Sequence, residues 1–285
     1  MTDSSLLIYG QSGSGKSSIG AELVKLARAA GRTVRVLLAE ESLPLRKLMN
    51  SVLDPNDVWD ITSRNHPFET IRLAVDGYWA QDPRDPKSKL ASTNADFWVF
   101  EGAATIAELL MGSTVEGGLA ARYGRGMEIG QEEKTVRFTD GKQQIGGNPR
   151  THYGVVQRWV LEAMAISRRL PGVKLWTTHE LRVSDERTSL PIVGPEIIGE
   201  AKTRGDAIPR LFGSMFHTEL IIKANKLSWA LHLGPHSDAA IQTIICRAKT
   251  QMPSSNGSPF IGQPEQIAKA LSEHLQLDWK PTQPK

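Results

Sequence analysis

Short apolar runs alternate with segments of helical periodicity along the first 180 residues. Residues 6–9 (Leu-Leu-Ile-Tyr) form the first run, and apolar residues then recur at helical spacing over residues 19–27, ahead of Gly31. Further strands are predicted at residues 33–38, 58–62, 96–101 and 173–178, and further helices at residues 66–79 and 153–170. Strands that alternate with helices in this way predict an α/β fold, with a mostly parallel sheet covered by helices.

The pattern changes towards the C-terminus, where three strand-like segments follow one another without a long helix between them. They span residues 219–223, 228–233 and 243–249, and a short helix is expected over residues 264–275. The hairpin-like spacing predicts an antiparallel extension of the sheet. We therefore divide the chain into a core over residues 1–252, with a glycine-rich loop insertion at 112–150, and a C-terminal loop, short helix and tail over residues 253–285.

Composition and charge narrow the class of protein. The 285 residues are 40% hydrophobic and 23% charged, with a formal net charge of +3, which is ordinary for a soluble globular protein. The single cysteine, Cys246, excludes an internal disulfide and a thiolate-rich zinc site and is expected to be structural. No apolar run approaches the roughly 20 residues of a membrane helix. We expect a cytoplasmic protein with no membrane partner.

One glycine-rich motif lies between the first predicted strand and the first predicted helix. Residues 10–17 read Gly-Gln-Ser-Gly-Ser-Gly-Lys-Ser and fit G-x-x-x-x-G-K-[ST] at every fixed position. Inward-pointing backbone N–H groups and the helix N-terminus can together hold phosphates. We predict a site for ATP and Mg²⁺, in which Lys16 bridges the β- and γ-phosphates and Ser17 binds the metal. The predicted nucleotide-binding residues are Gly10, Gln11, Ser12, Gly13, Ser14, Gly15, Lys16, Ser17 and Ser18. A turn that only joins a strand to a helix is the alternative.

A carboxylate follows the second predicted strand, which ends in Ala39-Glu40-Glu41. At the carboxyl edge of the sheet, Glu40 could orient or deprotonate an attacking water molecule. Glu41 is the neighbouring candidate, and a helix cap or a solvated acidic turn remains the alternative for both.

The phosphate loop and the segment from Gly31-Arg32-Thr33 to Ala39-Glu40 resemble the core of RecA-type recombinases. The resemblance implies a RecA-like P-loop NTPase fold, in which Glu40 is the catalytic base. It also places a second acidic motif at the strand that ends in Glu101, where the family usually carries aspartate, so Glu101 would support Mg²⁺ through water. A buried strand that simply ends in an acid is the other interpretation of Glu101.

Residues 177–180 (Thr-Thr-His-Glu) are similar to the Thr-x-His-Glu sensor of phage ATPases with the same core. The resemblance implies that His179 or Glu180 senses the γ-phosphate and takes part in catalysis. We do not expect His179 to bind a metal ion, because no cysteine or histidine stands near it at zinc-like spacing.

Two segments are candidates for contact with DNA. In the RecA-type family, loops corresponding to residues 112–150 and 183–216 face single-stranded DNA, and a basic residue of the second reaches a neighbour's ATP. Lys202 and Arg204 are the leading candidates for that residue. Residues 136–142 could form a small hairpin, and a plain surface excursion is an equal alternative for the whole insertion.

The resemblance as a whole implies an ATPase that acts on single-stranded DNA in phage-type recombination or annealing. Its nucleotide would lie between the subunits of a homo-oligomeric ring or filament. Two alternatives stay open: a motor such as a helicase or packaging ATPase, and a nucleotide-gated scaffold with little turnover.

Overall fold

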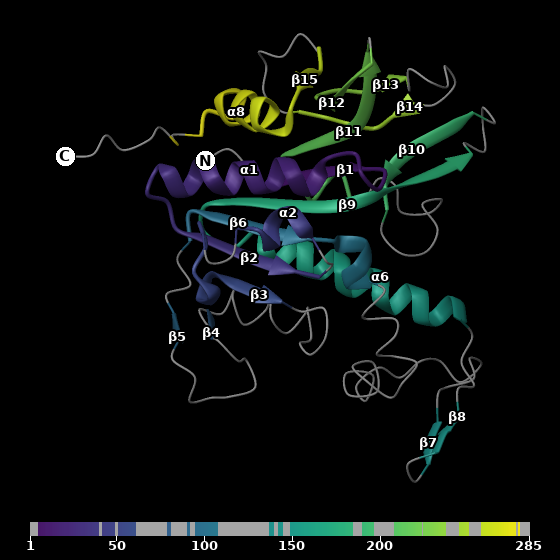
Figure 1. Cartoon of the computed structure of the whole chain (residues 1–285). Coiled ribbons are helices and arrows are strands. Elements are labelled where there is room, and N and C mark those ends of the chain that lie inside the picture. Colours follow the sequence, from purple (N-terminus) through teal and green to yellow (C-terminus); the bar gives the residue numbers. More distant parts are fainter. Residues whose placement is uncertain are drawn as a thin grey trace.

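The structure is a computed structural model (Figure 1). It describes residues 5–39, 42–48, 51–60, 79–80, 90–91, 95–107, 137–139, 142–144, 149–184, 190–196, 208–223, 225–237, 245–250, 258–277 and 279.

An eleven-stranded sheet forms the centre of the molecule. Six of its strands form one continuous parallel run, in the spatial order β3-β2-β6-β9-β1-β11. In that order they are β3 (Val58–Asp60), β2 (Val34–Leu38), β6 (Phe97–Glu101), β9 (Val173–Ser184), β1 (Ser5–Gly10) and β11 (Ser214–Lys223). Strands β1, β2 and β6 are buried along their whole length, as expected of parallel strands with both faces covered.

Further strands extend the sheet on both sides of β9 and β1. On one side, β11 pairs with β12 (Lys226–His232), and β12 pairs with β15 (Phe260–Gly262). On the other side, the second half of β9 pairs with β10 (Pro191–Pro195), which is followed in space by β14 (Ile245–Cys246) and β13 (His236–Ser237). All of these pairings are antiparallel except that of β10 with β14, which is parallel.

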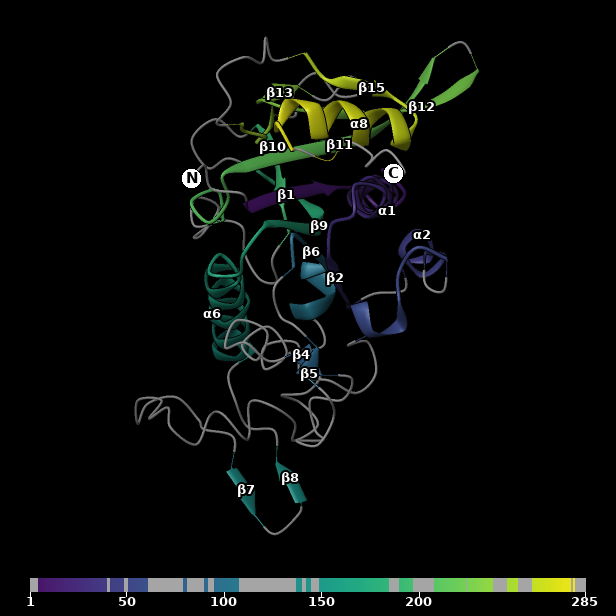
Figure 2. The same ribbon diagram turned by 90° about the vertical axis from the view of Figure 1, so that its left-hand side faces the viewer.

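Helices cover both faces of the parallel strands. Figure 2 shows α1 (Lys16–Ala29) and α6 (Pro149–Ser167) on opposite sides of β1 and β9. A separate buried cluster lies on each face, one containing Leu7 and Trp176 and the other containing Ile8 and Leu23. The C-terminal helix α8 (Pro264–His274) packs against α1 and contributes Leu271 to the second cluster.

The predicted α/β fold, with a mostly parallel sheet, covering helices and antiparallel strands near the C-terminus, is confirmed. The small hairpin inside the glycine-rich segment is present as β7 (Arg137–Thr139) and β8 (Lys142–Gln144). The short elements α2 (Leu43–Arg46), η1 (Pro55–Asp57), β4 (Trp79–Ala80) and β5 (Leu90–Ala91) complete the described structure. In the described part of the chain, no helix is long and apolar enough to cross a bilayer.

Some predicted elements have other bounds in the structure or lie outside its described residues. The strand expected to end at residue 178 continues to Ser184, because its second half finds a new partner in β10. The strand expected over residues 243–249 is reduced to β14 within the described residues 245–250. The helix expected at residues 66–79 lies outside the described residues except for Trp79, which belongs to β4 and pairs with Ala91.

Candidate nucleotide-binding site

The glycine-rich loop connects the carboxyl end of β1 directly to the N-terminus of α1. Gly15 caps the helix in the left-handed conformation, with φ of 93°. A Cβ atom on Gly10 would lie 2.3 Å from the backbone oxygen of Thr218 in β11, so only glycine fits between the strands. The loop is also tied to β11 by a 2.8 Å hydrogen bond between the hydroxyl groups of Ser14 and Thr218. The sequence thus builds a tightly anchored loop at a helix N-terminus, which is suited to binding an anion.

Lys16 curls back over this loop. Its ammonium group donates hydrogen bonds to the backbone oxygens of Gly10 (2.9 Å) and Gln11 (2.8 Å). The side chain is buried to 5% exposure, so its charge is held inside the loop. A phosphate group bound in the loop would replace these two carbonyl oxygens as partners of the ammonium group. Binding phosphate is the role predicted for Lys16.

The structure brings together the two residues predicted to bind the metal. The hydroxyl of Ser17 donates a hydrogen bond to one carboxylate oxygen of Glu101, and Thr177 of β9 donates to the other at 2.7 Å. Thr177 also accepts a 3.0 Å hydrogen bond from the backbone N–H of Gly102, immediately after β6. Hydroxyl and carboxylate oxygens are hard ligands, so this group fits Mg²⁺.

Glu101 itself is completely buried. A buried carboxylate is costly unless hydrogen bonds satisfy its oxygens. Two hydroxyl groups meet that need, which explains how an acid can end a strand whose other residues are all buried and apolar.

Several predicted residues lie outside the described part of the chain. These are Glu40 and its neighbour Glu41, the basic candidates Lys202 and Arg204, and most of the insertion at residues 112–150. Their roles stay predictions.

His179 and Glu180 occupy consecutive positions of β9 just beyond the loop. His179 is level with Gly10 in the pairing of β9 and β1, and its backbone oxygen accepts a 2.7 Å hydrogen bond from Glu196. Glu180 lies one residue further along β9, and its side chain is only 6% exposed. Burial alone would raise the pKa of Glu180, but hydrogen bonds from His217 and Gln11, helped by Arg182, hold the pKa below its ordinary value. Glu180 is therefore an ionised group, and Gln11 of the glycine-rich loop is among the residues that stabilise its charge.

Three contacts at this site had no signal in the sequence. Thr218 anchors the loop, Trp229 of β12 packs so closely on Gly15 that a Cβ atom there would lie 2.6 Å from the indole, and His217 of β11 bonds Glu180 at 2.9 Å. All three lie in the C-terminal strands, about 200 residues beyond the loop, where the sequence indicated only a sheet extension. Pairing of β11 with β1, and of β12 with β11, brings them to the site.

His217 continues into a cluster with two further histidines, His232 and His236. The rings of His232 and His236 stack with their centroids 3.4 Å apart. Burial and the neighbouring His232 lower the pKa of His236 to about 4, so this imidazole is neutral at pH 7. Cys246 lies next to the cluster in β14 and is fully buried, with its sulfur 4.0 Å from Nε2 of His217.

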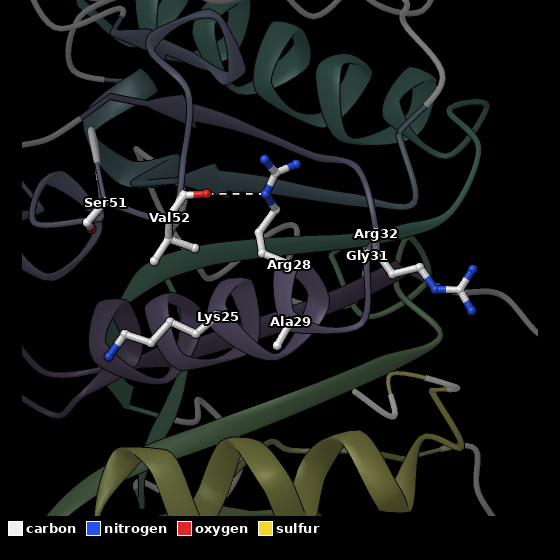
Figure 3. A pocket seen from close by; sticks show the side chains of 7 residues that line it. All are labelled: Lys25, Arg28, Ala29, Gly31, Arg32, Ser51 and Val52. Atoms are coloured by element: carbon white, nitrogen blue, oxygen red, sulfur yellow. Dashed lines mark hydrogen bonds between the residues drawn. The ribbon is translucent and has the colours of Figure 1, made fainter. Parts of the chain in front are cut away.

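A pocket of about 540 Å³ lies at the other end of α1, away from the phosphate loop (Figure 3). Lys25, Arg28 and Arg32 contribute to its lining. In Figure 3 Lys25 and Arg32 point away from each other, and Arg28 donates a 3.2 Å hydrogen bond to the backbone oxygen of Val52. These cationic side chains do not converge on one point, so the pocket is a weaker candidate for phosphate binding than the glycine-rich loop.

No protein-family model matches the sequence, and no curated protein matches it. Among solved structures, a KaiC-like protein from the hyperthermophilic archaeon Pyrococcus horikoshii matches at 12% sequence identity and a TM-score of 0.46, over 93% of this chain and 88% of that one. The flagellar accessory protein FlaH from Methanocaldococcus jannaschii matches at 13% identity and a TM-score of 0.41, over 92% of this chain and 85% of its own.

Proposed function

We propose that this chain is a RecA-like P-loop ATPase, which binds ATP with Mg²⁺, hydrolyses it and acts on single-stranded DNA in phage-type recombination or annealing. The observation that carries the nucleotide site is the contact between Ser17, at the start of α1, and Glu101, at the end of β6. A turn that merely joined β1 to α1 would not need a hydroxyl on a fully buried carboxylate.

Each residue then has a definite task. The backbone of residues 10–18 and the ammonium group of Lys16 bind the phosphates, while Ser17 and Glu101 hold the metal ion. Bound Mg²⁺ would neutralise phosphate charge as the bond to the γ-phosphate breaks. Glu40 takes a proton from the attacking water, and His179 or Glu180 responds to the γ-phosphate. Glu180 is suited to that response, because it already receives a hydrogen bond from Gln11 of the loop.

Single-stranded DNA and a homo-oligomeric ring or filament are inferred from the resemblance to RecA-type proteins. A nucleotide-gated scaffold with little turnover is the second candidate. It is favoured by Glu101, which is one methylene longer than the usual aspartate and has both oxygens engaged by hydroxyl groups.

ATP turnover measured with and without single-stranded DNA, at about 50 and about 200 mM salt, tests this function. We expect turnover that DNA stimulates, and a loss of about 10²- to 10⁴-fold in Glu40→Gln, because a general base is removed. Glu41→Gln is the matched variant that decides between the two neighbouring carboxylates. Lys16→Ala should lose ATP affinity.

Four other outcomes have clear meanings. Unchanged ATP affinity in Lys16→Ala would contradict the phosphate-loop assignment. Wild-type turnover in Glu40→Gln would exclude Glu40 as the base. ATP binding without turnover or response to DNA would favour the scaffold, and directional movement along DNA would favour a motor.

A further inference from the structure

Three histidines meet on the side of the sheet that faces away from α1. His217 and His232 are directly opposite each other in the pairing of β11 and β12, and His236 begins β13. Each offers one ring nitrogen, and these nitrogens all lie within 4.8 Å of one another. None of the three belongs to the phosphate loop or to the metal-binding pair Ser17 and Glu101.

The second nitrogen of each ring is already held by an acceptor. Nε2 of His217 lies 2.9 Å from Glu180, Nε2 of His232 lies 2.7 Å from Glu219, and Nδ1 of His236 lies 3.1 Å from the backbone oxygen of Gly234. A backbone carbonyl oxygen can only accept a hydrogen bond, and a carboxylate oxygen accepts one in the same way. In the tautomer that satisfies these three acceptors, each imidazole carries its proton on the outer nitrogen.

This arrangement leaves a lone pair on Nδ1 of His217, on Nδ1 of His232 and on Nε2 of His236. Nδ1 of His217 and Nε2 of His236 are only 3.2 Å apart. Two facing acceptors repel each other unless a cation lies between them. The edge of a tetrahedron with zinc–nitrogen bonds of about 2.0–2.1 Å is about 3.3 Å long, so the separation of these two nitrogens suits two ligands of one ion. The ring of His232 stacks parallel to that of His236, with centroids 3.4 Å apart, so His232 must turn out of this stack to direct its lone pair at the same ion.

We propose that His217, His232 and His236 bind a transition-metal ion of the zinc class. Ions of this class bind imidazole nitrogen much more readily than Mg²⁺ does. Metal-binding histidines almost always donate their other N–H to a carboxylate or a backbone carbonyl, and each of these three histidines faces such an acceptor. Three protein ligands leave a tetrahedral ion one further position for water or an incoming group.

The ion would stabilise a junction of the fold. It would join β11, β12 and β13, and it would hold the N–H of His217 towards Glu180, which is bonded to Gln11 in the phosphate loop. Glu180 would then be a neighbour of both the metal site and the nucleotide site. The proposed metal site does not depend on ATP binding.

Titration of the metal-free full chain with Co²⁺ tests the site by visible absorption. We expect bands that saturate at one Co²⁺ per chain, displacement by Zn²⁺ and no competition from Mg²⁺. His232→Gln and His236→Gln should weaken binding by at least about 100-fold, and Glu219→Gln by about 10- to 100-fold. His274→Gln is the matched control, since His274 lies against Phe260 and Thr250, outside the cluster, and should bind Co²⁺ like the wild type.

Two results would overturn the site: no saturable binding of Co²⁺ to the wild type, as expected if a shared proton occupied the cluster, or wild-type affinity in both His232→Gln and His236→Gln. An X-ray absorption spectrum of the zinc-loaded wild type counts the imidazole ligands directly, so this test does not depend on whether a variant folds. Three imidazole ligands around zinc would support the site, and fewer than three would exclude it.

Discussion

At the scale of single residues, hydroxyl groups decide how this protein keeps an acid in its interior. Ser17 and Thr177 each donate to one oxygen of Glu101, and Thr177 uses its own oxygen to accept from Gly102. Thr177 therefore acts on Ser17 and Glu101, the two residues predicted to bind the metal, without being one of them.

Replacement of Thr177 with valine keeps the shape of the side chain and removes this hydroxyl. We expect a loss of about 1–3 kcal/mol in the free energy of unfolding, because Glu101 loses a donor and the Gly102 N–H loses its acceptor. The dependence of ATP binding on Mg²⁺ should also weaken. Thr178→Val is the matched control: it loses a bond to the backbone oxygen of Glu196, so stability should fall, but the response to Mg²⁺ should not change. An equal response to Mg²⁺ in the two variants would contradict the role of Thr177.

At the scale of elements, β9 organises the molecule. Its first half pairs in parallel with β6 and β1, and its second half pairs antiparallel with β10. One strand thus places Thr177 next to Glu101 and Glu180 next to the glycine-rich loop. Its second half also connects the sheet, through β10, to the strands beside the histidine cluster. Its position is set at Gly172, the residue before its first, where the chain turns in from α6.

Gly172 is the position at which a substitution should disturb β9. Its φ is 72°, and a Cβ atom would lie 2.2 Å from the backbone oxygen of Asp96, which accepts the hydrogen bond from Val173 that starts the pairing with β6. We expect Gly172→Ala to cost more than about 2 kcal/mol in urea denaturation, since backbone strain and a backbone clash combine. Gly194→Ala in β10 is the control, because a Cβ atom there meets nothing within 4 Å. Similar stability of the two variants would contradict this prediction and would mean that the turn at Gly172 can accommodate a side chain.

At the scale of the whole molecule, the C-terminal helix is part of the same core as the phosphate-loop helix. Helix α8 packs on α1, and its residues Ile267, Ala268 and Leu271 are buried. Trp279, beyond the helix, packs on Phe97 of β6 with ring centroids 4.9 Å apart. The C-terminal segment therefore stabilises the face of the sheet that supports α1.

Leu271→Ala tests this dependence. Leu271 is fully buried, so its truncation should cost about 2–5 kcal/mol of folding free energy, through lost burial and the cavity left behind. Lys269→Ala, on the exposed side of the same helix, should change stability by less than about 0.5 kcal/mol. Chemical denaturation of both variants gives the comparison, and a small effect of Leu271→Ala would mean that α8 contributes little to the core.

The sequence by itself determined the features that depend on neighbouring residues. Apolar runs, helical spacing and the unbroken motif from Gly10 to Ser17 predicted the α/β class and the loop between β1 and α1, because periodicity and turn chemistry are local properties. The placement of Glu101 at a strand end also followed from local pattern. The role of Glu40 came from its place at a strand end together with the family resemblance, those of His179 and Glu180 came from the resemblance alone, and all three stay predictions.

Only the tertiary structure decided which distant residues meet. Thr218 reaches the loop, and His217 meets His232 and His236, through strand register and the pairing of β11 with β1. A register shift of one residue would turn each of these side chains to the opposite face of the sheet, and no spacing along the chain records which register is adopted. The glycine-rich loop between β1 and α1 could therefore be predicted from the sequence alone, whereas the histidine cluster became visible only when the strands were paired.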